Sequence, residues 1–169
     1  MIRRIRWTIG ALLLATVASA AVAYAQFRRP FFNNNTAPPT ELVIARWQYT
    51  ARGKFGGTGW SHNFPSSDQH FAQVLSEATN INVKNVSYRI VQLGSPEVFD
   101  YPFAVVSEPG EMSLTDAEVK NLREFIERGG FVLMDDFDGP RDLAVLQRDF
   151  HRAFPDRNFV RIGLDHEIF

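Results

Sequence analysis

Three short runs of consecutive apolar residues constrain the fold of this chain more than any other feature. They are Leu42–Ala45, Phe103–Val106 and Phe131–Met134. Apolar runs without polar alternation are typical of strands covered on both faces, as in a parallel sheet. Val86–Leu93 alternates with polar residues, which places it at an edge of that sheet, and Phe159–Ile162 is predicted to begin a further strand.

A segment of helical periodicity follows the first predicted strand. It is opened by Ser66 or Ser67 and carries apolar residues at positions i, i+3, i+4 and i+7, namely Phe71, Val74, Leu75 and Ala78. We therefore expect this apolar stripe to pack on the sheet.

Two more helices are predicted. One begins with the capping box Thr115–Glu118, stops at Gly129–Gly130, and has an apolar face of Val119, Leu122 and Ile126. The other is amphipathic from Leu143 to Phe154 and ends before Pro155. Strands that alternate with helices predict an open α/β sheet with right-handed crossovers, formed by a single domain over residues 41–169.

The N-terminus has the order of features of a secretory signal peptide. Three arginines precede an uncharged apolar stretch, Ile9–Val22, and Ala23–Ala25 supplies the small-x-small cleavage pattern. We predict cleavage after Ala25, a periplasmic or secreted product, and no membrane span after cleavage. Residues 26–40, rich in Asn, Pro and Arg, are predicted to form a disordered linker.

The composition excludes cysteine-dependent features and argues against nucleic-acid binding. The chain has no cysteine, which excludes disulfides, thiolate metal ligands and a lipidated cysteine. Without the three arginines of residues 1–25, the 18 Lys and Arg fall to 15 against 19 Asp and Glu, a net charge of −4. No basic stripe is present, so nucleic acid is not an expected partner.

Acidic residues follow two of the predicted strands. Glu108 comes after one, and Asp135 and Asp136 come at the end of another. Ligands of an open parallel sheet bind beyond the carboxyl ends of its strands. Adjacent strand residues point to opposite faces, so we expect at most one of the two aspartates to join Glu108 in a site, where coupled carboxylates could serve as acid and base. The alternative is that each acid caps the next turn or helix.

The glycine-rich loop Arg52–Gly59 matches neither a Walker loop nor a dinucleotide fingerprint, because Lys54 precedes the glycines. We interpret it as a mobile loop and expect no cofactor. For a metal site, His62, Glu108, Asp136 and His166 are the available N and O ligands. Scattered His and Asp are usually surface or capping groups, so no metal is expected. Without a G-x-S-x-G elbow, a serine hydrolase is also not expected.

Four motifs in this order resemble the bacterial domain-of-unknown-function 4159 family: Trp60–Pro65, Ser107–Gly110, Gly129–Phe137 and His166–Phe169. That family is similar to the class I glutamine amidotransferase-like and trehalose-utilisation-like proteins. The resemblance therefore implies a flavodoxin-like, three-layer α/β sheet.

The resemblance also shows departures. Asp135 and Asp136 stand where an amidotransferase would have its nucleophilic cysteine, and without a thiol glutaminase chemistry is excluded. Asn63 replaces a frequent acid and Glu167 replaces a usual proline. Family members continue past His166–Phe169, so we expect this copy to be C-terminally truncated.

These residues are compatible with three functions. The first is a periplasmic module that binds a small polar ligand or an envelope protein through Trp60, His62, Glu108, Asp135, Asp136 and His166. The second is a hydrolase, on a carbohydrate-type substrate, with Glu108 and Asp136 as its catalytic acid and base and with or without a metal from His62 and His166. The third is an envelope scaffold whose important surface is the arm of residues 26–40.

Overall fold

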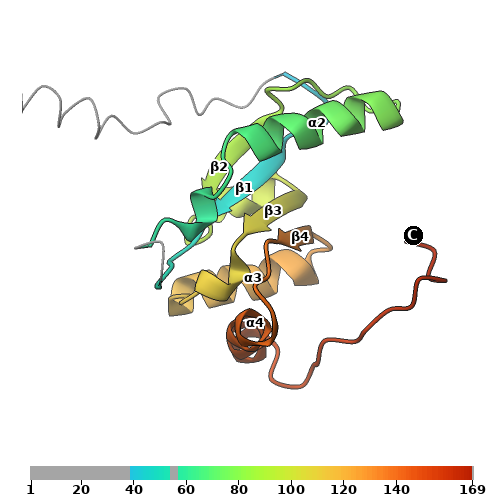
Figure 1. Cartoon of the computed structure of the whole chain (residues 1–169). Coiled ribbons are helices and arrows are strands. Elements are labelled where there is room, and N and C mark those ends of the chain that lie inside the picture. Colours follow the sequence, from blue (N-terminus) through green and yellow to red (C-terminus); the bar gives the residue numbers. More distant parts are fainter. Residues whose placement is uncertain (1–38, 54–56, 169) are drawn as a thin grey trace, which may run out of the picture. The chain divides into compact units, whose positions relative to one another are not determined.

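The computed structural model describes residues 39–53 and 57–168. The predicted signal peptide, and the predicted linker except for its last two residues, lie outside the described residues. The described part is a mixed α/β fold in which four parallel strands alternate with helices (Figure 1). None of its helices has the length and apolarity needed to cross a bilayer.

The four strands pair in parallel in the order β2-β1-β3-β4, and they are β1 (Ile44–Gln48), β2 (Tyr88–Gln92), β3 (Phe103–Ser107) and β4 (Phe131–Asp135). The predicted parallel sheet is therefore confirmed, and the alternating strand does lie at an edge. In the register of β3 and β4, Ser107 stands opposite Asp135. The residues that come after these two strands therefore emerge side by side at one edge of the sheet.

The α-helices of the described part occupy the predicted segments: α2 (Ser66–Ala78), α3 (Asp116–Glu127) and α4 (Pro140–Ala153). Two neighbouring residues of β1 show how they are layered. Arg46 bonds Asp68 of α2, whereas the ring of Trp47 contacts Phe125 of α3 edge-on at 4.8 Å. Adjacent strand residues point to opposite faces. Helices α2 and α3 therefore cover opposite faces of the sheet, and α4 packs against α3.

The ends of α3 agree closely with the sequence pattern. The Thr115 hydroxyl accepts from the Glu118 N–H, and the Glu118 carboxylate accepts from the Thr115 N–H, which completes the capping box. Gly129 ends the helix with φ of +88°, a left-handed conformation that costs glycine little. Leu122 and Phe125 form the buried face, so Phe125 extends the predicted apolar stripe.

The predicted apolar stripe of α2 is partly wrong. Val74 is 58% exposed, and the buried positions are Asp68 and Ala72. The reason is that the buried charge of Arg46 lies beneath this helix and selects an acid as its neighbour. Helix α2 begins at Ser66 with Pro65 as its N-cap, so Ser67 lies inside the first turn, where its hydroxyl accepts from Arg46.

The predicted strand Phe159–Ile162 is also wrong. These residues are irregular and exposed, with Val160 at 82%. Within the described part of the chain, β4 pairs with β3 alone and no ladder includes residues 159–162. An apolar run without a neighbouring strand gains no ladder hydrogen bonds to offset the entropy of ordering its backbone.

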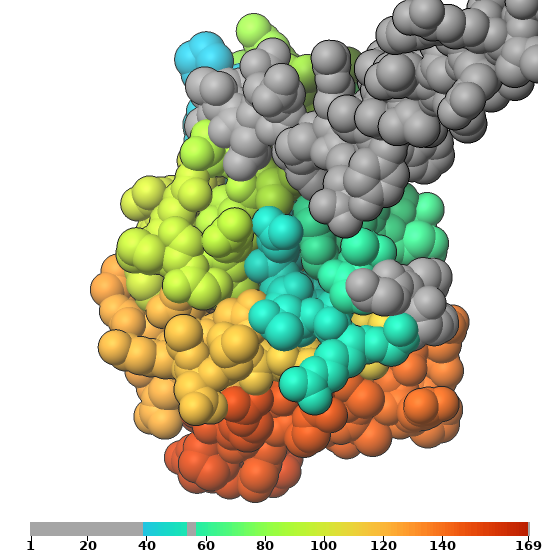
Figure 2. Space-filling view, turned by 90° about the vertical axis from the view of Figure 1, so that its left-hand side faces the viewer, coloured from blue at the N-terminus to red at the C-terminus, as the bar shows by residue number. Residues whose placement is uncertain are grey.

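Short 3-10 helices complete the described fold: η1 (Gly59–Ser61), η2 (Pro96–Asp100) and η3 (Pro109–Glu111). Two of them flank the carboxyl edge of the sheet. η1 precedes α2, and η3 follows β3 directly. Figure 2 shows the segment after β1, in cyan, on the surface of the molecule, close to the yellow and orange segments later in the chain.

Candidate functional site

Three side chains from separate segments meet beyond the carboxyl ends of β3 and β4. The Nδ1 atom of His62 lies 3.0 Å from Oε1 of Glu108 and 3.5 Å from Oδ2 of Asp136. The Glu108 side chain is 5% exposed, whereas those of His62 and Asp136 are 40% and 34% exposed. A buried carboxylate thus supports a histidine that reaches solvent.

The backbone at this place is strained. Among the described residues, the non-glycine residues with positive φ are Asn63 (58°), Glu108 (50°) and Asp136 (65°). Two of them contact His62 and the third comes after it in the chain. The left-handed conformation costs a residue such as Glu108 about 1–2 kcal/mol and costs asparagine and aspartate less, because their short side chains can bond the local backbone. Strain of this kind persists where the surrounding structure enforces it, and it clusters at functional sites.

Tyr49 supports the strained turn after β3. Its hydroxyl lies 2.7 Å from the Ser107 carbonyl oxygen and 2.6 Å from that of Glu108. Burial raises the pKa of the Tyr49 hydroxyl, the charges of Glu111 and Glu108 raise it further, and Arg46 opposes them. The phenol therefore stays protonated and remains a donor to this turn.

Arg46 ties the site together from inside the sheet. Its guanidinium is bidentate to Asp68, with Nε–Oδ1 at 3.0 Å and Nη2–Oδ2 at 2.7 Å. Nη1 also donates to the Ser107 hydroxyl at 2.6 Å, Nη2 donates to the Ser67 hydroxyl at 2.7 Å, and Nη1 donates to the Trp60 carbonyl at 3.5 Å. One side chain thereby fixes β1, β3, α2 and the loop that carries His62.

Sequence reasoning missed Arg46, although a signal was present. Arg46 stands between Ala45 and Trp47, next to a run predicted to be covered on both faces. A charge in such a place requires a buried acid as its partner. Asp68, in the first turn of α2, supplies it.

A small cavity of about 140 Å³ is lined by Asp136, one of the three residues. Its polar lining includes Asn63, Ser107, Asp135 and Asp136, and Leu133 contributes to its apolar part. Asp136 is the aspartate that approaches His62 beside Glu108, and both Asp135 and Asp136 line the cavity. The reason is that β4 ends at Asp135 and the left-handed backbone of Asp136 breaks the alternation of the strand.

Two predicted site residues lie elsewhere. Trp60 is 5% exposed, and its carbonyl oxygen is what meets Arg46, so it positions the loop from within. His166 lies in the C-terminal segment, where its Nδ1 accepts from the Ile168 N–H at 3.2 Å. Neither residue lines the cavity next to Asp136.

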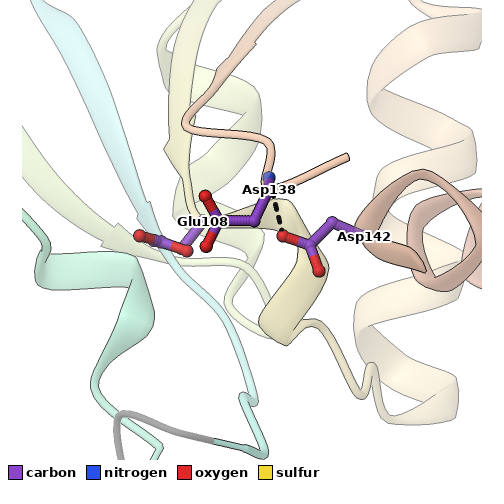
Figure 3. Close-up of side chains that lie close together, drawn as sticks. All are labelled: Glu108, Asp138 and Asp142. Atoms are coloured by element: carbon purple, nitrogen blue, oxygen red, sulfur yellow. Dashed lines mark hydrogen bonds between the residues drawn. The ribbon is translucent and has the colours of Figure 1, made fainter. Parts of the chain in front are cut away.

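A second group of carboxylates shares Glu108. Oxygen atoms of Glu108, Asp138 and Asp142 lie within 4.8 Å of one another (Figure 3), and the Asp138 N–H donates to Asp142 at 2.9 Å. An all-oxygen set suits Mg²⁺ or Ca²⁺ better than Zn²⁺. Of the ligands considered from the sequence, only Glu108 belongs to this group. Asp138 and Asp142 were missed because acids before and within a first helical turn ordinarily serve as caps.

The family model described as "Domain of unknown function (DUF4159)" matches residues 43–169. The match includes His62, Glu108 and Asp136. A search of the curated proteins found no match. The family description gives no activity, so the site has to be interpreted from its own geometry.

Proposed function

This chain belongs to the DUF4159 family, and from the geometry of its site we propose that it is an exported module that binds a small polar ligand at His62, Glu108 and Asp136. The observation that carries the proposal is the strain around His62. Asn63, Glu108 and Asp136 hold left-handed backbones in one place. Each costs stability, and a binding site is a common reason for such strain to be kept.

The charges of the site favour a neutral or cationic ligand. Glu108 and Asp136 supply carboxylates beside His62, and Asp135 supplies another in the adjoining cavity. The nearby cation Arg46 is already neutralised by Asp68. An anion would therefore meet more carboxylates than cations, even with His62 beside Glu108 and Asp136. A ligand with hydroxyl or amine donors would find acceptors on these three carboxylates and on Asn63.

The test compares two triple variants in a thermal-shift screen with sugars, polyols, amino acids and amines. The site variant is His62→Gln, Glu108→Gln and Asp136→Asn. The control is His70→Gln, Glu77→Gln and Asp156→Asn, which makes the same chemical changes at exposed positions. Compounds that stabilise the wild type and the control should leave the site variant unshifted, because stabilisation requires binding to the folded state. Equal shifts in the site variant would sink the proposal.

The contacts of His62 also favour a second candidate, a hydrolase that uses Glu108 and Asp136 as acid and base. Both carboxylates approach the same ring nitrogen, so they lie close to each other. Their environments differ, since Glu108 is buried and Asp136 is partly exposed. Acid and base roles are taken by carboxyl groups in different environments.

Hydrolysis is tested with nitrophenyl glycosides and esters. Glu108→Gln and Asp136→Asn, made singly, should each remove the activity, because one group supplies the proton and the other accepts it. The cysteine-free chain should leave glutamine unhydrolysed in a parallel assay of ammonia release. Activity that survives both single changes would exclude the acid–base pair.

Export belongs to the same proposal and rests on the charge and apolar pattern of residues 1–25. Expression of the full chain in a bacterium should yield a periplasmic protein whose N-terminal residue is Gln26. Recovery of the uncut chain from the cytoplasm would contradict export.

We also propose that the sheet is the flavodoxin-like one. The strand order β2-β1-β3-β4 agrees with the first four positions of the flavodoxin-like order 2-1-3-4-5. In that fold ligands bind at the switch point between β1 and β3. Arg46 of β1 and Ser107 of β3 meet at this point, beside the proposed site. An experimental structure in which β4 lies between β1 and β3 would refute the assignment.

A further inference from the structure

A larger cavity lies on the helical side of the molecule. It has a volume of about 730 Å³ and is lined by residues of α3, α4 and the turn after α4. Its lining shares no residue with the cavity beside Asp136, so a ligand bound here would be independent of the proposed function. Pockets for small molecules commonly measure about 300–1,000 Å³.

The walls of this cavity are mainly aromatic. Ile126 of α3 and Phe150, Phe154 and Phe159 form its apolar part. The rings of Phe150 and Phe159 lie 5.0 Å apart and are tilted by 54°, and the Arg157 N–H donates to the Phe154 carbonyl at 3.2 Å. These contacts hold the turn after α4 against the helix and keep the cavity formed.

The charged residues of the lining are arginines. The lining includes Arg148, His151 and Arg157. No carboxylate among the described residues lines the cavity. Arg148 is neutralised by Asp149, whose carboxylate lies 3.1 Å from it. Arg157 stacks over the Phe154 ring at 4.9 Å and has no carboxylate partner within residues 39–53 and 57–168. An unbalanced guanidinium therefore stands beside apolar walls.

The C-terminal end of α4 opposes an anion here, because helix C-termini carry partial negative charge. Arg123 reduces this effect. Its Nη1 donates to the Ala153 carbonyl at 3.2 Å, and its guanidinium lies 5.8 Å from the Phe154 ring. Two arginines thus flank Phe154. Arg123 is also paired with Glu127, at 2.9 Å, so the cation available at this end of the cavity is Arg157.

We propose that this cavity binds an anionic amphiphile, that is, an acyl or aryl chain with a carboxylate head. The chain would pack on Phe150, Phe154 and Phe159. The carboxylate would pair with Arg157, whose planar guanidinium can hold it with two hydrogen bonds.

Isothermal titration calorimetry of the full chain with dodecanoate, below its micelle concentration, tests the proposal. One equivalent should bind, and dodecyltrimethylammonium, with the same chain and a cationic head, should bind at least tenfold more weakly. Arg157→Gln should weaken dodecanoate binding by roughly tenfold, the change that about 1.4 kcal/mol produces. Arg141→Gln, an exposed arginine of α4 outside the lining, should bind dodecanoate as the wild type does.

Three results would overturn the proposal. One is equal affinity for the anionic and cationic amphiphiles. Another is unchanged dodecanoate binding by Arg157→Gln. The third is a stable dimer in sedimentation that dodecanoate neither binds nor dissociates, which would mean that a second copy covers the cavity. The His62, Glu108 and Asp136 triple variant should still bind dodecanoate, which separates this site from the other one.

Discussion

Arg46 and Asp68 form a bidentate ion pair in the interior, with Nε–Oδ1 at 3.0 Å and Nη2–Oδ2 at 2.7 Å. The side chains are 1% and 0% exposed. A buried pair adds little net stability over a well-packed apolar pair, but loss of one partner leaves the other charge uncompensated. The pair therefore fixes the position of α2 and of the loop before it, and its integrity is a condition for the site.

Asp68→Asn should lower the free energy of unfolding by about 3–5 kcal/mol, because the Arg46 charge stays buried without its counter-charge. Urea unfolding followed by circular dichroism measures the change. Glu97→Gln breaks the partly exposed pair with Arg89 and is the matched control, with an expected cost below about 1 kcal/mol. Equal costs for the two variants would contradict a dominant role for the buried pair.

The left-handed backbone at Asp136 makes a second prediction. Asp136→Gly and Asp136→Ala both remove the carboxylate, but only glycine adopts φ of +65° without strain. The glycine variant should be more stable than the alanine variant by about 1 kcal/mol. Both should lose the ligand-induced thermal shift of the wild type. If urea unfolding gives the alanine and glycine variants the same free energy of unfolding, the backbone at Asp136 is not strained.

Much of this arrangement could be predicted from the sequence. Apolar runs and helix caps locate the strands and helices, and parallel strands necessarily bring their carboxyl ends to one edge. This general property is why Glu108 and Asp136 could be expected to meet. Glu108 and Asp136 also contact His62, so the loop that carries His62 lies at the same edge of the sheet.

What could not be predicted depends on side chains that reach across the fold. The periodicity of α2 favours an apolar stripe, yet Asp68 is buried because Arg46 lies opposite. The left-handed turn at Asp136 brings both aspartates to one cavity, against the alternation of a strand. The run at Phe159 has the composition of a strand, but pairing requires a neighbour that composition alone does not provide.

Asp149 makes a third prediction, on acid stability. Burial acts to raise the pKa of its carboxyl, but hydrogen bonds from Arg148, from the Leu114 N–H and from Arg152 outweigh burial, and the pKa is lowered from 3.8. The unfolded chain therefore takes up this proton first as the pH falls. The stabilisation is fully present above pH 3.8 and is lost as the pH falls through the lower pKa of the folded state.

Asp149→Asn should remove this part of the acid dependence. Urea midpoints of wild type and variant between about pH 2 and 7 measure it, and the difference in stability should shrink toward acid pH. Asp156→Asn changes an exposed aspartate, so its urea midpoints should depend on pH in the same way as those of the wild type. A constant difference between Asp149→Asn and the wild type at all pH values would mean that Asp149 does not titrate differently in the two states.

Tyr49 makes the last prediction, at the opposite end of the pH scale. Its hydroxyl supports the Glu108 turn, and burial raises its pKa above 10.0. The unfolded chain loses this proton first as the pH rises, so the stabilisation is fully present below pH 10 and is lost progressively above it. Tyr49→Phe should cost about 1 kcal/mol at neutral pH through the lost hydrogen bond, and this cost should diminish above pH 10.

Chemical denaturation from neutral to alkaline pH measures the effect of Tyr49, with Tyr88→Phe as the matched loss of a hydroxyl on β2. If the stabilities of Tyr49→Phe and Tyr88→Phe depend on pH in the same way, the buried phenol of Tyr49 does not cause the loss of stability at alkaline pH. Because the Tyr49 hydroxyl meets the carbonyl oxygens of Ser107 and Glu108, the same variant should also weaken the ligand response without any change to a residue that contacts His62. A Tyr49→Phe protein with a full ligand response would show that the Glu108 turn is held by β3 and Pro109 alone.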